Sequence, residues 1–198
     1  MSSARDRILN KLSTDVSTKA NIKYNADIYT ELSGDLVNDF KAELNLVDGE
    51  VFIVDSISDL NKTINQYLTD NNFDNIYSNQ KIVTLNENYT IIKEFNKDID
   101  VAITGCEYLS ARTGSVVVSS AIDGRKINIF APTHIVIAKQ NQIVKDIDEA
   151  INNLKTKYNK LPSSISFITG PSRTADIEKT LILGAHGPKR LAVFIIKE

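Results

Sequence analysis

The segment from Gly170 to Glu178, GPSRTADIE, carries residue types suited to binding a small anion. It follows an apolar run, and we expect it to open a helix of about ten residues. A helix N-terminus presents unpaired N–H groups and partial positive charge, Ser172 and Thr174 add hydroxyls, and Arg173 suits a carboxylate or phosphate. The same residues also fit a capped helix, with Thr174 as the cap and Arg173 paired to an acid. Both interpretations stay open.

A second segment with reactive side chains follows the apolar run DVAIT, where Thr104 and Gly105 precede Cys106 and Glu107. Glu107 could serve as an acid or base and Cys106 as a nucleophile, although both also fit buried structural positions. Because Gly105 and Gly170 each follow an apolar strand, we expect both turns at the carboxyl edge of one sheet, around one crevice.

Further candidates are Arg112, Thr113 and Gly114 before the run SVVVSS, and the two histidines, His134 and His186. Gly114 permits a tight turn or a close backbone approach, and Arg112 could bind an anion or remain a solvated loop residue. An imidazole beside a rigid turn could move protons, although a lone histidine is often structural. The histidines lack metal-ligand spacing, and there is neither a P-loop nor a GxGxxG after a strand, so we expect no metal and no cofactor.

The predicted site gathers these segments around a small carboxylate or phosphate. We take no residue as catalytic and leave open whether the protein is an enzyme. The expected ligand-binding residues are Thr104, Gly105, Thr113, Gly114, His134, Gly170, Ser172, Arg173, Thr174 and His186.

Strand and helix patterns alternate from Gly49 onward, which predicts an α/β fold with a largely parallel sheet covered on both faces. The middle of the chain breaks that rhythm, so we expect some antiparallel pairing there. Helices are expected from about Ser58 to Leu68 and from Val144 to Tyr158. The expected strands are Glu50–Val54, Asn75–Tyr77, Lys81–Leu85, Asp100–Thr104, Ser115–Ser120, Lys126–Phe130, His134–Ala138, Ser164–Thr169 and Leu191–Lys197.

The first 46 residues show helical spacing and no strand signal. One helix is expected near Ile8, a polar linker follows, and a second helix begins at about Asp27 with Phe40 and Leu44 on its apolar stripe. We therefore predict an N-terminal helical arm over 1–46 and an α/β domain over 47–198. The arm should pack on the domain or on a second subunit, which would make the protein a homo-oligomer.

The composition excludes several classes of function. The formal net charge of −2 over 198 residues argues against a broad surface for nucleic acid. A single cysteine cannot form an internal disulfide or hold an iron–sulfur cluster alone, which suits a cytoplasmic protein. No apolar run approaches the roughly 20 residues of a membrane span, and the N-terminus lacks the apolar core of a secretory signal.

The motifs TGPSRTADIE and GAHGP, in that order before a terminal apolar run, resemble the signature of the lactate-utilisation C family, also called the LUD domain. Upstream, ITGCEYLSARTGSVVVSS and APTHIVIA resemble the central block of that family, and ARDRILNKL resembles its N-terminal helix. One departure is Arg112, which stands in ARTG where many members have AETG.

The resemblance implies a three-layer α/β/α sandwich similar to the NagB/RpiA/CoA-transferase-like fold. It also implies an accessory subunit of a bacterial system that oxidises L-lactate to pyruvate, with iron–sulfur proteins as partners. The alternative is a stand-alone enzyme acting on a sugar phosphate or acyl-CoA, with Glu107 as its best candidate carboxylate. The departure at Arg112 weakens the carry-over of a glutamate-dependent CoA-transferase mechanism.

Overall fold

The computed structural model describes Arg5 and residues 31–92, 98–122, 131–177, 180–184 and 187–197, with the backbone alone described for 174–177 and 180–183. Expectations that lie outside these residues are the helix near Ile8, the linker after it, the strand Lys126–Phe130 and the position of His186. Leu32–Glu198 form one compact unit, to which the following description refers.

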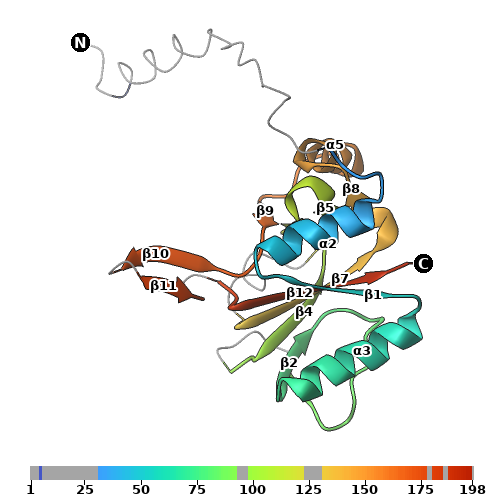
Figure 1. Ribbon diagram of the computed structural model, residues 1–198, viewed down its shortest axis with the longest axis vertical. Helices are drawn as coiled ribbons and strands as arrows, with labels where there is room; N and C mark the ends of the chain where they lie inside the picture. Colours follow the sequence, from blue (N-terminus) through green and yellow to red (C-terminus); the bar gives the residue numbers. More distant parts are fainter. Residues whose placement is uncertain are drawn as a thin grey trace. The chain divides into compact units, whose positions relative to one another are not determined.

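A six-stranded, fully parallel sheet forms the centre of this unit, in the order β1-β12-β7-β4-β2-β3 (Figure 1). The strands are β1 (Glu50–Val54), β2 (Asn75–Ser78), β3 (Thr90–Ile92), β4 (Val101–Gly105), β7 (Thr133–Lys139) and β12 (Arg190–Ile196). Continuous apolar runs such as LAVFII are needed in the middle strands because both faces of those strands are covered. The predicted α/β class with a mostly parallel sheet is confirmed.

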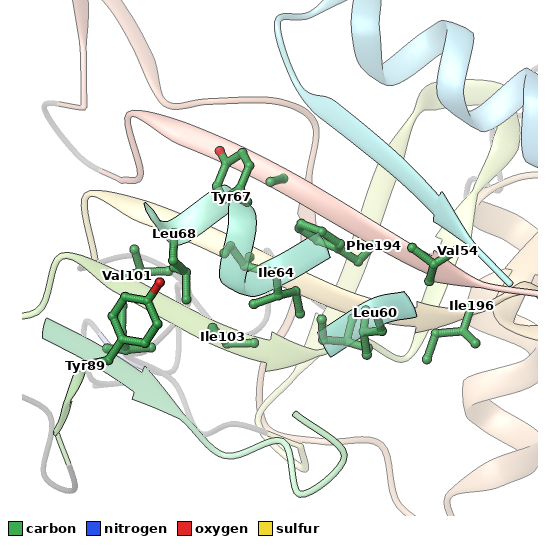
Figure 2. Close-up of a cluster of buried hydrophobic side chains, with 14 residues drawn as sticks. Val54, Leu60, Ile64, Tyr67, Leu68, Tyr89, Val101, Ile103, Phe194 and Ile196 are labelled. Carbon is green, nitrogen blue, oxygen red and sulfur yellow. The ribbon is translucent and has the colours of Figure 1, made fainter. Parts of the chain in front are cut away.

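Helix α3 (Ile57–Asp70) covers one face of this sheet. Ser56 caps its N-terminus by accepting a hydrogen bond from the backbone N–H of Asp59. Leu60, Ile64 and Leu68 recur at helical spacing and are fully buried against the strands, as Figure 2 shows. Burial of each such side chain contributes about 1.5–3 kcal/mol, so this stripe fixes the helix to the sheet.

Helix α2 (Leu36–Leu46) and a second sheet cover the opposite face (Figure 1). The second sheet has the order β8-β5-β6-β9, and β6 pairs antiparallel with both neighbours, which confirms the expected antiparallel pairing. Phe40 and Leu44 of α2 are fully buried in this core, so the described end of the expected arm packs on the α/β domain. The strands are β5 (Tyr108–Ser110), β6 (Ser115–Ser119), β8 (Ile143–Val144) and β9 (Ile165–Ile168).

Helix α5 (Ile147–Lys157) lies on the second sheet. The short 3-10 turn η2 (Ala111–Thr113) connects β5 to β6, and η3 (Gln140–Gln142) connects β7 of the parallel sheet to β8. Ala150 and Leu154 are the buried residues of α5 and pack on Val117 and Val144. The helix begins later than expected because Asp146 caps it, accepting a hydrogen bond from Glu149 N. Among the described residues, no helix has both the length and the apolar character needed to cross a bilayer.

The prediction of a helix after Gly170 is wrong. The chain instead forms an antiparallel hairpin of β10 (Arg173–Ile177) and β11 (Thr180–Leu183), with a register shift between Thr174 and Ile177. Thr174, Ile177 and Ile182 are β-branched, and such residues favour strands over helices. The serine and threonine that suggested a helix cap are equally frequent in turns.

The strand expected at Lys81–Leu85 is also wrong, because this segment pairs with side chains and not with another strand. Asn61 Oδ1 accepts a hydrogen bond from Thr84 N at 2.8 Å, and Asn65 Nδ2 donates to Thr84 O at 2.9 Å. Asn65 Oδ1 also accepts from Asn86 N. Two asparagines on α3 thus satisfy the backbone groups that a neighbouring strand would otherwise bind.

Candidate functional site

His134 and Thr104 form a buried polar pair on the face of the parallel sheet that points toward the second sheet. In the pairing of β4 with β7, His134 lies opposite Ala102, so Thr104 is the next residue along on the same face. Thr104 Oγ1 lies 2.7 Å from His134 Nε2, and both residues are completely buried. No described residue hydrogen-bonds to His134 Nδ1, which is buried as well. An unsatisfied buried nitrogen costs about 1–3 kcal/mol, so a group that bonds to it is stabilised there.

The hydrogen bonds of Thr104 determine which kind of group can bond to Nδ1 of His134. Burial lowers the pKa of His134 to about 4, so its imidazole is neutral at pH 7, with one donor and one acceptor nitrogen. Thr104 Oγ1 also donates to Gly105 O at 3.1 Å, and its single hydrogen is then unavailable to Nε2. In this arrangement Nε2–H donates to Thr104, and Nδ1 is an acceptor that suits a hydroxyl group and not a carboxylate oxygen.

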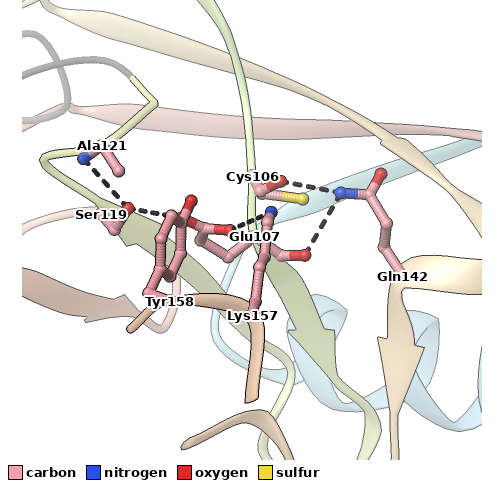
Figure 3. A network of polar contacts seen from close by, with 7 residues as sticks. All are labelled: Cys106, Glu107, Ser119, Ala121, Gln142, Lys157 and Tyr158. Atoms are coloured by element: carbon pink, nitrogen blue, oxygen red, sulfur yellow. Dashed lines mark hydrogen bonds and ion pairs between the residues drawn. The ribbon is translucent and has the colours of Figure 1, made fainter. Parts of the chain in front are cut away.

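Glu107 occupies a closed network in a different part of the molecule (Figure 3). Its carboxylate accepts hydrogen bonds from Ser119 Oγ at 2.5 Å, Tyr158 OH at 2.9 Å and Lys157 Nζ at 2.8 Å. The Glu107 side chain is fully buried, whereas that of Lys157 is half exposed. The hydrogen bond to Glu107 raises the pKa of Lys157, and burial together with the same carboxylate raises the pKa of Tyr158.

This network fixes the end of α5 to the second sheet. Glu107 N donates to Val117 O in β6, and Gln142 Nε2 donates to the carbonyl oxygens of Cys106 and Glu107 at 2.7 and 3.2 Å. Cys106 is buried and has further contacts of its own. With three donors and no exposed surface, the Glu107 carboxylate has the environment of a structural anchor, one of the two interpretations that the sequence left open.

Thr113 belongs to a chain of hydroxyl groups at the end of the second sheet. Its Oγ1 donates to Ser110 Oγ at 2.9 Å and lies 2.8 Å from Ser115 Oγ. Ser115 Oγ in turn lies 2.7 Å from Thr169 Oγ1, just ahead of Gly170. The sheet therefore brings Thr113 close to the Gly170 segment.

Two predicted site glycines are required by close contact with α2. Gly114 has a φ of +58°, and a Cβ there would lie 2.4 Å from Leu44 N. Gly170 has a φ of +81°, and a Cβ there would lie 2.5 Å from Val47 O. A side chain at either position would displace the end of α2, so packing alone accounts for both glycines.

Arg173 pairs with an acid that the sequence did not single out. Its Nη2 lies 2.7 Å from Asp48 Oδ2, and both side chains are partly exposed. Asp48 has a φ of +61°, a left-handed conformation that aspartate tolerates better than most residues. The contact with Asp48 uses one of the five N–H groups of the guanidinium.

The expectation that Gly105 and Gly170 share the carboxyl edge of one sheet is wrong. Gly105 ends β4 in the parallel sheet, whereas Gly170 follows β9 in the second sheet. Ser172 N donates to Pro188 O at 2.8 Å, and Lys189 N donates to Pro132 O at 2.7 Å. The Ser172 segment therefore lies at the amino end of β12, which pairs with β7, and His134 is the second residue of β7 at the same edge.

The predicted residues thus fall into three places. Thr104, Gly105 and His134 line the parallel sheet, and Thr113, Gly114 and Gly170 lie by the end of α2. Ser172 and Arg173 lie at the base of the hairpin, the side chain of Thr174 is not described, and His186 is outside the described residues. Arg112 has a contact of its own and its backbone N–H donates to Lys145 O.

Sequence reasoning missed several residues that these networks use. Asp48, Lys157 and Tyr158 are far from their partners along the chain, and no local motif links them. The one available signal was the helical face shared by Leu154 and Tyr158, which placed Tyr158 toward the second sheet.

Comparison with known protein families identifies the family of this chain. The model of the LUD domain matches residues 71–196, which is more than half of the chain. The chain belongs to the LUD domain family. The matched region of this LUD domain contains the His134–Thr104 pair, the Glu107 network and the Ser172 segment, and the predicted family resemblance is confirmed.

Curated relatives are about one-third identical to this LUD domain over an aligned segment that spans about half of the chain. It is 35% identical over 103 residues to lactate utilization protein C of Bacillus subtilis, which is 50% of this chain and 43% of that protein. It is 34% identical over 104 residues to an uncharacterised protein of Neisseria meningitidis serogroup B, covering 52% of this chain and 45% of that protein. Each match therefore spans less than half of the relative's length.

A solved structure has the same fold. The crystal structure of a DUF162 family protein from Deinococcus radiodurans matches this LUD domain with a TM-score of 0.64 at 17% identity. The match covers 84% of this chain and 99% of that chain.

Proposed function

We propose that this LUD domain takes part in lactate utilisation and binds a small α-hydroxy acid beside His134. The observation that carries the proposal is the buried, neutral imidazole whose Nδ1 has no partner among the described residues. An acceptor nitrogen in that position matches the hydroxyl of lactate. The names of relatives such as lactate utilization protein C of Bacillus subtilis support the same substrate class.

The proposed role is that of an accessory subunit in a bacterial system that oxidises L-lactate to pyruvate, in the cytoplasm, with iron–sulfur proteins as partners. In this role the LUD domain holds or senses the acid, and a partner subunit carries the electrons. Omission of the LUD domain from a reconstituted complex should abolish or greatly slow lactate oxidation. Undiminished oxidation without it would contradict the accessory role.

The ligand test exploits the presence of only two histidines in the chain. In protein with ¹⁵N-labelled histidine, L-lactate should shift the Nδ1 resonance of His134, which is assigned by its disappearance in His134→Asn. Thr104→Val serves as the matched variant, because it removes the hydroxyl that orients the imidazole while preserving side-chain volume. Absence of any shift with L-lactate, pyruvate or phosphate would overturn the proposed site.

The stand-alone enzyme is the weaker alternative. It needs a carboxylate that can reach a substrate, and Glu107 is enclosed by Ser119, Lys157 and Tyr158. Turnover of an acyl-CoA or sugar phosphate by the isolated protein would favour this alternative.

A further inference from the structure

Strand β1 leaves one side of its backbone without a partner in the described structure. It is an edge of the six-stranded sheet and pairs only with β12. Val54 O accepts a hydrogen bond from Lys197 N at 3.0 Å, which directs the backbone groups of Val54 toward β12. Because successive residues of a strand alternate, Val51 and Ile53 direct their N–H and C=O groups away from β12.

The free side of β1 borders a groove whose other wall is α3. The groove has a volume of about 460 Å³. Asp59, Thr63, Gln66 and Asp70 recur at helical spacing along this wall, and residues 52–55 form the opposite wall. Phe52 and Tyr67 add an apolar surface between the walls, with ring centroids 5.4 Å apart in an edge-to-face arrangement.

The groove carries an excess of negative charge. Asp55, Asp59 and Asp70 line it, whereas Lys62 is its one lysine or arginine. Lys197, outside the lining, pairs with Asp55 at 2.7 Å, so the excess rests on Asp59 and Asp70. Asp70 is the last residue of α3, where the helix dipole disfavours a carboxylate. An acid at this position is therefore better suited to a positively charged partner than to the stability of the helix.

The strand also lacks most features that prevent association at sheet edges. Its sequence, EVFIV, contains no lysine and no proline, and its register with β12 is continuous from Glu50 to Val54. Val51, Phe52 and Ile53 are all partly exposed. A partly exposed apolar edge of this kind is a template for another strand.

We propose that the groove between β1 and α3 binds an extended segment of a partner protein in which apolar residues alternate with lysine or arginine. The segment adds to β1 as a new strand and bonds to the free backbone groups of Val51 and Ile53. Its apolar side chains contact Phe52 and Tyr67. Its basic side chains meet Asp59 and Asp70. This surface is separate from the His134 site, and the inference does not depend on the proposed function.

A second copy of the chain fits the groove less well than a basic partner does. Glu50 begins β1 and is exposed, so a second β1 would bring a further acid to an acidic groove. Like charges brought together in this way are unfavourable.

The test uses the full chain and a fluorescent six-residue peptide of alternating lysine and valine, with binding followed by fluorescence anisotropy. Ile53→Pro removes an N–H that points away from β12 and should weaken binding about tenfold. Ile91→Pro is the matched control at the opposite edge. Thr90 N donates to Asp74 O, so Ile91 N also points outward, and Ile91 is 47% exposed. This control should leave affinity unchanged.

A charge-reversal variant keeps the proposal testable if Ile53→Pro does not fold. Asp70→Lys should weaken binding of the lysine peptide several-fold and improve binding of the matching glutamate peptide, with both effects reduced in 0.5 M salt, a condition where the screening length is roughly 4 Å. Equal binding of the lysine and glutamate peptides by the unmodified protein would overturn the proposal. A stable dimer that Ile53→Pro dissociates would also overturn it, because a second copy would then occupy the edge.

Discussion

Lys157 Nζ lies 2.8 Å from Glu107 Oε2, across fifty residues of chain, and joins the end of α5 to the start of β5. Ser119 and Tyr158 donate to the same carboxylate, so three segments depend on one buried acid. Loss of the Glu107 carboxylate would therefore leave the hydroxyl groups of Ser119 and Tyr158 without this acceptor.

Glu107→Gln should lower the free energy of unfolding by about 2 kcal/mol, because an amide preserves the shape but places an NH₂ group among three donors. Urea denaturation measures the loss. The matched control is Glu87→Gln at an exposed position, where the change should stay within about 0.5 kcal/mol. Equal effects of the two substitutions would show that the network adds no stability.

The Lys157–Glu107 pair should also weaken in alkaline solution. The pKa of Lys157 is raised in the folded protein, so the pair stabilises the fold below the ordinary lysine pKa of 10.5. That contribution is lost as the pH rises through the raised pKa. The free energy of unfolding should therefore fall less between pH 8 and pH 11 in Lys157→Met than in the unmodified protein. Urea denaturation at the two pH values measures both differences.

His134 should make the protein less stable in acid. Its pKa is about 4 when folded and 6.5 when unfolded, so below pH 6.5 the unfolded chain binds more protons. Stability therefore falls between pH 6.5 and pH 4, by up to roughly 3 kcal/mol at one pKa unit per 1.4 kcal/mol. The fall in unfolding free energy from pH 6.5 to pH 4 is measured for the unmodified protein and for His134→Asn. The difference between the two falls is the contribution of His134. Identical acid profiles for the two proteins would contradict a neutral, buried imidazole.

Gly114→Ala should cost more stability than Gly34→Ala. Both glycines have positive φ, so both substitutions introduce backbone strain of about 1 kcal/mol. Only at Gly114 does the new Cβ meet a backbone atom, Leu44 N at 2.4 Å, whereas at Gly34 there is nothing within 4 Å. The difference in melting temperature between the two variants measures the contact with α2. A difference of zero would mean that α2 moves away without cost.

Arg173→Ala should weaken binding of a small carboxylate about 10- to 150-fold, which corresponds to the 1.5–3 kcal/mol of a charge-assisted hydrogen bond. The melting temperature should barely change, because the Asp48–Arg173 pair is partly exposed. Asp48→Asn is the matched variant, since it frees the guanidinium and should strengthen binding. A large stability loss in Arg173→Ala with unchanged affinity would assign Arg173 a structural role.

The domain boundary near residue 46 stays a prediction, and the burial of Phe40 and Leu44 favours a boundary ahead of α2. Stripes of apolar residues could be read from the sequence because burial on a helix or strand leaves a local period. That period correctly indicated α3, α5 and the apolar strands of the parallel sheet, and the LUD motifs indicated the family.

The tertiary structure alone decided which polar residues meet. Arg173 meets Asp48 and Glu107 meets Lys157 across long stretches of chain, and hydrogen bonds at such separations leave no spacing in the sequence. The hairpin after Gly170 was missed because threonine and serine suit a helix cap and a turn alike, and pairing between β10 and β11 settled the choice. The sequence by itself determined the family, the fold class and which residues have side chains that could bind a ligand or react. Only the tertiary structure places Gly105 at the end of a strand in one sheet and Gly170 after a strand in the other. The reason is that strand order depends on packing between distant segments and not on local pattern.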